Sequence, residues 1–153
     1  MEYISYGLGQ FDVYKFNKIK NIEYLNKPKG GLWASPIDAK HGWKDWCEAE
    51  DFRDCKEDNS FRFTLKDNAK VYYINSIIDC KNMPQLQYDL GFKENMIYPD
   101  FEKMKQIGID AIQFNLSNDT KSSFCDGLYW ALYGWDCDCI LVLNKDVIEL
   151  LDK

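Results

Sequence analysis

Two aspartates, Asp136 and Asp138, are the residues whose type and spacing best suit catalysis. They lie in the segment WDCDCILVLN, directly before a continuous apolar run of strand length. Residues two apart in an extended chain point to the same side, so this spacing predicts both carboxylates in one cleft. Carboxylates held so close repel each other, which suits them to hydrogen bonding or acid–base work. A solvated pair at the mouth of a strand is the alternative.

A second group of candidate residues lies in the segment from residue 29 to 47, KGGLWASPIDAKHGWKDWC. Two glycines permit a sharp turn, a short strand follows, and Ser35 before a proline is typical of a helix N-cap. Three of the chain's five tryptophans lie here, and Trp33 and Trp43 are candidates for the walls of a ligand cleft. The alternative is a strand and a helix packed together through large aromatic side chains.

The six cysteines and the single histidine suggest thiol or zinc chemistry. Residues of the types that ligate zinc occur at Cys125, Cys137, Cys139 and His41. No cysteine pair has C-x-x-C spacing, so scattered buried thiols are the simpler interpretation, and no metal is predicted. The residues after Met1 form no basic and apolar leader, so we expect a cytoplasmic protein with reduced thiols.

Length and charge limit the functional class. The chain of 153 residues suits one domain, 1–153. Its 19 basic and 25 acidic residues give a net charge of −6 and a pI near 4.8, which disfavours charge-driven binding to nucleic acid or to an anionic membrane. No stretch approaches the roughly 18 apolar residues of a membrane span, so no membrane partner is predicted.

Hydrophobic periodicity predicts short strands and short helices that do not alternate regularly, which favours an α+β fold over a doubly wound α/β fold. Strands are expected over 3–7, 32–34, 61–65, 71–78, 109–114 and 139–143. Helices are expected from Ser35 onward to residue 47, near 85–90, over 100–106 and over 147–151. The turn residues at 67–68 predict a hairpin between two of the strands.

The order of these features resembles that of ADP-ribosyltransferase-like proteins. A first strand ends at Tyr6 and Gly7, a glycine-led strand carries Ser35, and an Asp-x-Asp pair leads into a late strand. The resemblance covers most of the chain. It implies a single α+β domain with a short-stranded split β-sheet core and a few short helices, and it implies NAD as the cofactor that serves as substrate.

By this resemblance, the nicotinamide half of NAD binds beside the first strand. Tyr6 occupies the position that the family gives to Arg or His, and the Gly7 backbone grips the nicotinamide amide. Trp33 or Trp43 stacks on the nicotinamide ring. With a tyrosine at residue 6, the first strand lacks the usual cation of the family.

The resemblance also implies catalytic roles. Ser35 supports the ribose side of the site, and Asp138 stabilises the oxocarbenium-like centre as nicotinamide leaves. Asp136 orients the acceptor, which is a protein or a nucleic acid. Asp138 replaces the usual glutamate and is one methylene shorter. Two hypotheses follow: an NAD-dependent ADP-ribosyltransferase or NAD hydrolase, and a non-catalytic nucleotide- or protein-binding module on the same fold.

Overall fold

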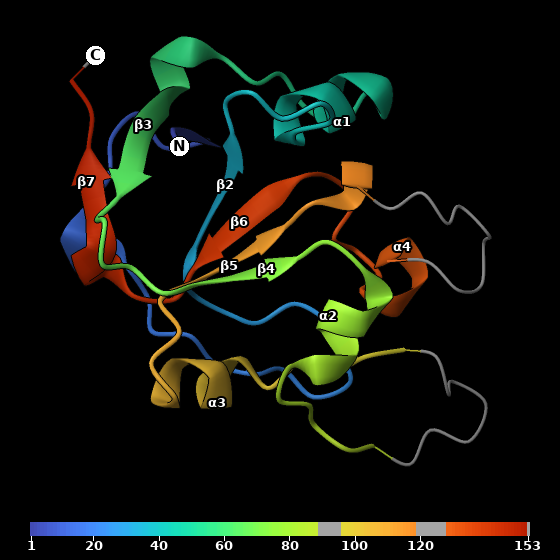
Figure 1. Ribbon diagram of the computed structural model, residues 1–153. Helices are drawn as coiled ribbons and strands as arrows, with labels where there is room; N and C mark the ends of the chain where they lie inside the picture. Colours follow the sequence, from blue (N-terminus) through green and yellow to red (C-terminus); the bar gives the residue numbers. More distant parts are fainter. Residues whose placement is uncertain (89–95, 119–127, 153) are drawn as a thin grey trace.

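The apolar, β-branched segments form a mixed β-sheet in the computed structural model (Figure 1), which describes residues 1–88, 96–118 and 128–152. Within these residues the sheet has seven strands: β1 (Tyr3–Tyr6), β2 (Leu32–Pro36), β3 (Ser60–Leu65), β4 (Val71–Ile74), β5 (Ala111–Phe114), β6 (Cys139–Val142) and β7 (Ile148–Leu150). Their order is β4-β5-β6-β2-β1-β3-β7, and every neighbouring pair except β4 with β5 is antiparallel. The sheet therefore places β6, β2 and β1 side by side.

Strand β2 links the two parts of the sheet. Residues 32–34 pair with β6, whereas Ser35 and Pro36 pair with β1. In Figure 1 the strands β4, β5 and β6 run across the molecule, while β3 and β7 run steeply at one side. Ser35 therefore lies near the point where the two groups of strands meet.

Side chains of the central strands alternate between two apolar cores. On β6, Cys139 and Leu141 pack into one cluster, whereas Ile140 and Val142 pack into a second cluster with Phe63. All four residues of β6 are buried. A strand covered on both faces shows a continuous apolar run rather than alternation, which explains the sequence pattern at this strand.

Short helices pack against the first cluster. The described elements include α1 (Trp43–Ala49), α2 (Ile77–Asn82), α3 (Phe101–Gln106) and α4 (Leu128–Ala131), with 3-10 turns at Val13–Lys15, Glu57–Asn59, Leu116–Asn118 and Lys145–Val147. Ser76 caps α2 and Asp100 caps α3, each by accepting a backbone N–H of the first turn. Among the described residues, no helix has the length and apolarity that a bilayer crossing requires.

Most of the expected elements are confirmed. The strands β1, β2, β5 and β6 lie where periodicity predicts them, and α3 follows its Asp100 cap. Gly108 follows α3 with a φ of +87°, a conformation that suits glycine at a helix end. Together the elements form one α+β domain.

A predicted hairpin and a predicted C-terminal helix are both wrong. Strands β3 and β4 form no hairpin, because β3 pairs with β1 and β7, and β4 pairs with β5. The segment 147–151 is not a helix. Asn144 caps a 3-10 turn, after which β7 pairs with the edge of β3. In both places pairing with a distant strand outweighs local turn chemistry.

Two predicted helices also differ from the structure. Ser35 lies in β2, and α1 begins only at Trp43 with Gly42 as its N-cap residue. Of the segment 85–90, residues 85–88 are not helical and Gln85 forms a bridge with Pro99. Residues 89 and 90 lie outside the described residues.

Alanine at Gly30 tests the turn that leads into β2. Gly30 has a φ of +83°, and a Cβ there would lie 2.3 Å from the Lys18 carbonyl oxygen. Gly108, with a φ of +87°, is a matched control because its nearest atom would be Lys70 Nζ at 3.7 Å. We expect Gly108→Ala to lower the free energy of unfolding by about 1 kcal/mol through backbone strain. Gly30→Ala should cost clearly more, since a backbone oxygen cannot move aside. Equal losses in urea denaturation would contradict the packed turn.

Candidate functional site

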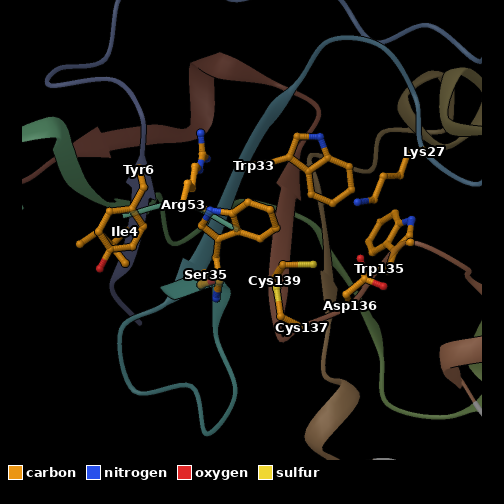
Figure 2. A pocket seen from close by; sticks show the side chains of 13 residues that line it. Ile4, Tyr6, Lys27, Trp33, Ser35, Arg53, Trp135, Asp136, Cys137 and Cys139 are labelled. Carbon is orange, nitrogen blue, oxygen red and sulfur yellow. The ribbon is translucent and has the colours of Figure 1, made fainter. Parts of the chain in front are cut away.

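A cavity of about 270 Å³ lies beside β1, β2 and the segment that leads into β6 (Figure 2). Five of the residues predicted from the sequence line it together: Tyr6, Trp33, Ser35, Trp43 and Asp136. Two others, Gly7 and Asp138, are not among the lining residues. The cavity therefore unites the first-strand, second-strand and late-strand candidates, with one of the two aspartates.

Indole rings form much of the cavity wall. Trp33 of β2 meets Trp135 edge-on with ring centroids 4.8 Å apart, and Trp43 of α1 stacks on Trp46 at 5.0 Å. The Trp135 Nε1–H donates to the Asn26 carbonyl oxygen at 2.8 Å, which fixes that ring. Such a preorganised apolar wall suits a flat aromatic ligand.

The end of α1 determines where the next residues lie. Asp51 adopts a φ of +48°, and the Phe52 N–H donates to the Cys47 carbonyl oxygen at 3.0 Å. This is the Schellman pattern, which usually brings an apolar side chain back onto the last helical turn. Phe52 accordingly packs on Trp46 at a centroid distance of 5.3 Å. The turn directs the following residue, Arg53, back toward the cavity.

Two cations line the cavity, each over an indole. Arg53 lies 5.3 Å from the Trp43 ring centroid, and Lys27 lies 5.6 Å from that of Trp33. Figure 2 shows Lys27 on the Trp33 side and Arg53 on the Tyr6 side. Sequence reasoning missed both, because each belongs to a charged stretch that resembles a solvated surface. The sequence signal for Arg53 is Phe52, the aromatic residue directly before it in an otherwise charged stretch, because an aromatic side chain there suggests that the stretch packs against the protein.

The Ser35 hydroxyl joins three segments. It accepts the Trp43 N–H at 2.9 Å and donates to the Asp138 carbonyl oxygen at 2.9 Å. Ser35 thus bonds to the first N–H of α1 although it lies in β2, eight residues before that helix begins. The prediction that its hydroxyl caps a helix is therefore confirmed, whereas the prediction that the helix follows it directly is wrong. Because Ser35 is 2% exposed and its hydroxyl makes both bonds, the hydroxyl holds the cavity wall in shape.

The two aspartates lie in different surroundings. Asp136 is half-buried and lines the cavity. Asp138 is buried, and its carboxylate accepts the Ser117 N–H at 2.8 Å and the Ser117 hydroxyl at 2.5 Å. The rule that residues two apart in a strand point to the same side does not apply to Asp136 and Asp138, because the regular strand begins only at Cys139. The spacing argument for one shared cleft is therefore wrong.

The end of β1 reaches the cavity through Tyr6. Burial raises the pKa of the Tyr6 phenol, and nearby Cys55 and Glu57 raise it further, so the hydroxyl stays a hydrogen-bond donor at neutral pH. Gly7 has a φ of +95°, and its N–H donates to the Asn59 carbonyl oxygen at 2.8 Å. That N–H is already bonded in this structure, so a nicotinamide amide would have to compete for it.

The cysteines do not form a metal site within the described residues. No group of three or more His, Cys, Asp or Glu side chains there is placed to hold a metal. Cys125 lies outside the described residues. Cys137 and Cys139 both line the cavity, and a hydrogen bond between the two thiols, together with burial, raises the pKa of the Cys139 thiol. The thiols of Cys47, Cys55, Cys137 and Cys139 are free of disulfide bonds.

Removing the Ser35 hydroxyl tests its structural role. Ser35→Ala leaves the Trp43 N–H and the Asp138 carbonyl without their partner, so we expect the free energy of unfolding to fall by about 1–3 kcal/mol. Ser35→Thr keeps a hydroxyl and should lose less. Chemical denaturation of the wild type and both variants measures the difference. Unchanged stability of Ser35→Ala would show that the hydroxyl does not hold the three segments together.

Comparison with protein-family models, with curated proteins and with solved structures found no match. The function proposed below therefore depends on the residues that line the cavity and on the order of the strands that carry them.

Proposed function

We propose that this protein is an NAD-dependent ADP-ribosyltransferase-like enzyme, which transfers ADP-ribose from NAD to a protein or nucleic-acid acceptor or hydrolyses NAD. One observation carries the proposal. Tyr6 from β1, Ser35 from β2 and Asp136 from the segment before β6 line a single cavity, and these strands are neighbours in the order β6-β2-β1. The three parts of the sequence resemblance are therefore also close in space.

The sheet supports the same proposal. The resemblance implies a split β-sheet core, and β2 pairs with β6 over its first residues and with β1 over its last. A strand shared in this way lets two groups of strands diverge and leaves a cleft at the point of divergence. Fold alone does not determine function, so the chemistry of the cavity has to supply the rest.

The cavity suits the nicotinamide half of NAD. Its volume of about 270 Å³ lies near the lower end of small-molecule sites, which suits one aromatic ring with part of a sugar. The indole of Trp33 offers a stacking surface for the nicotinamide ring, whereas the Trp43 ring already stacks on Trp46 and has Arg53 over it. The remainder of NAD then extends from the cavity along the protein surface.

The contacts of Asp136 and Asp138 favour catalytic roles for these residues that differ from the roles expected from the sequence. Asp136 faces the cavity, so we assign to it the stabilisation of positive charge on the ribose as the bond to nicotinamide breaks. Nicotinamide leaves with the bonding electron pair, water or an acceptor group attacks the same ribose carbon, and the proton of that nucleophile passes to solvent. Asp138, bonded to Ser117, acts as a positioning residue.

A second candidate function is a non-catalytic nucleotide- or protein-binding module on the same scaffold. Two observations favour it: the Gly7 N–H is bonded to Asn59, and the Asp138 carboxylate is bonded to Ser117. Groups bonded within the protein are less available to a substrate. In either case the free thiols of Cys47, Cys55, Cys137 and Cys139 suit the reducing cytoplasm.

Release of nicotinamide from NAD separates the two functions. We expect wild-type protein to release nicotinamide and Asp136→Asn to be slower by about 10²-fold or more, because the charge acts mainly in the transition state. Asp138→Asn should lower thermal stability, since its buried carboxylate holds two hydrogen bonds. Asp67→Asn, at an exposed turn, is the matched control and should match wild type.

A folded Asp136→Asn variant with wild-type activity would refute the assignment of Asp136. Wild-type protein that binds NAD but releases no nicotinamide with any acceptor would favour the binding module. Thermal melts of each variant show whether a lost activity reflects unfolding.

A further inference from the structure

We infer that Arg53 is a specificity-determining residue that binds the diphosphate of the ligand, so that the cavity selects nicotinamide nucleotides with a diphosphate over nicotinamide nucleosides, which lack phosphate. This inference rests on the proposed function, because it names the part of NAD that a particular side chain recognises. It concerns a residue that neither sequence pattern nor resemblance assigned to the site.

Two observations locate the Arg53 side chain. Its guanidinium lies over the Trp43 ring at 5.3 Å, and a Cβ placed on Gly7 would meet its Nη1 atom at 3.4 Å. The side chain therefore bridges from the first residue of α1 to the end of β1. Arg53 lines the cavity together with Tyr6 of β1. It therefore places a cation beside β1, a strand that contains no cationic residue.

The charge of the cavity differs in sign from that of the chain. Its charged lining residues are Lys27, Arg53 and Asp136, so two positive charges and one negative charge give a local net charge of +1. The whole chain has a net charge of −6. A local excess of cations in an acidic protein attracts an anionic ligand.

Nearby carboxylates do not neutralise Arg53. The ion pairs of this region join Lys44 to Glu48, Lys56 to Asp54, and Arg62 to Glu57. Within the described parts of the chain, Arg53 makes no ion pair with a carboxylate. Asp54 follows Arg53 in the sequence, but the Asp54 carboxylate pairs with Lys56, whose Nζ lies 3.2 Å away. The guanidinium therefore keeps hydrogen-bond donors for a ligand.

The chemistry of guanidinium makes a diphosphate the best match. An arginine presents its N–H donors in a planar fork that binds two phosphate oxygens at once. The cation–π contact with the Trp43 indole holds the guanidinium at the cavity wall. Lys27, held over Trp33, adds a second positive charge to the same cavity. A nicotinamide nucleoside has no phosphate and carries a positive charge on its ring, so it would gain nothing from Arg53.

Calorimetric titration with NAD and with nicotinamide riboside tests the inference on the full chain. We expect Arg53→Gln to weaken NAD binding roughly tenfold to hundredfold, as expected when a charged hydrogen-bond partner is lost, and not to weaken binding of the riboside, which is a cation without phosphate. Arg53→Lys keeps the charge without the fork and should lose less. Arg62→Gln, which removes the chain's other arginine, is the matched control and should bind NAD like wild type.

Added salt provides a test that needs no variant. Wild-type affinity for NAD should fall as salt concentration rises, whereas riboside affinity should not. Salt-independent NAD binding by wild type would overturn the inference even if Arg53→Gln failed to fold.

Two variant results would also overturn it. One is unchanged NAD affinity in folded Arg53→Gln, and the other is an equal loss of NAD and riboside, which would mean that Arg53 only supports Trp43. Wild-type protein that binds neither ligand would contradict the proposed function itself. NAD binding that survives the loss of Arg53 would contradict this inference alone.

Discussion

The hydroxyl of Ser35 is the interaction on which the candidate site depends. It ties β2 to the first N–H of α1 and to the carbonyl oxygen of Asp138. These bonds bring together segments more than 100 residues apart in sequence, since the Ser35 to Asp138 separation is 103. The backbone of Asp138 is held from its other side, because its N–H donates to the His41 carbonyl oxygen at 2.8 Å. Asp136 therefore reaches the cavity from a fixed point.

Around this fixed point, aromatic packing determines where charge is placed. The Schellman turn at the end of α1 brings Phe52 onto Trp46 and carries Arg53 over Trp43. This turn is what places Arg53, a cation within the acidic stretch after α1, at the cavity. Each cation over an indole is worth about 0.5–1 kcal/mol at an exposed site. The larger effect is geometric, because both charges line the same cavity.

How far the sequence predicts this structure depends on the range of the interactions. Buried strands such as β6 and the capped helix α3 follow from local patterns and are confirmed. The pairing of β3 with β1 and β7, rather than with β4, depends on distant partners and was missed. The site shows the same division. Type and order in the sequence select Tyr6, Ser35 and Asp136, which line the cavity. They do not select Arg53, because its approach to Gly7 joins residues with no shared pattern.

The central claim is that the cavity between β1, β2 and the segment before β6 holds the nicotinamide ring. Nuclear magnetic resonance of protein with ¹⁵N-labelled indoles tests it most directly, with signals assigned through single Trp→Phe variants. NAD should shift the indole N–H signals of Trp33 and Trp43 in a saturable way, at the same ligand concentration for both, because both rings line the cavity. If the signals of all five tryptophans stay in place up to millimolar NAD, the cavity does not bind NAD and the account is contradicted.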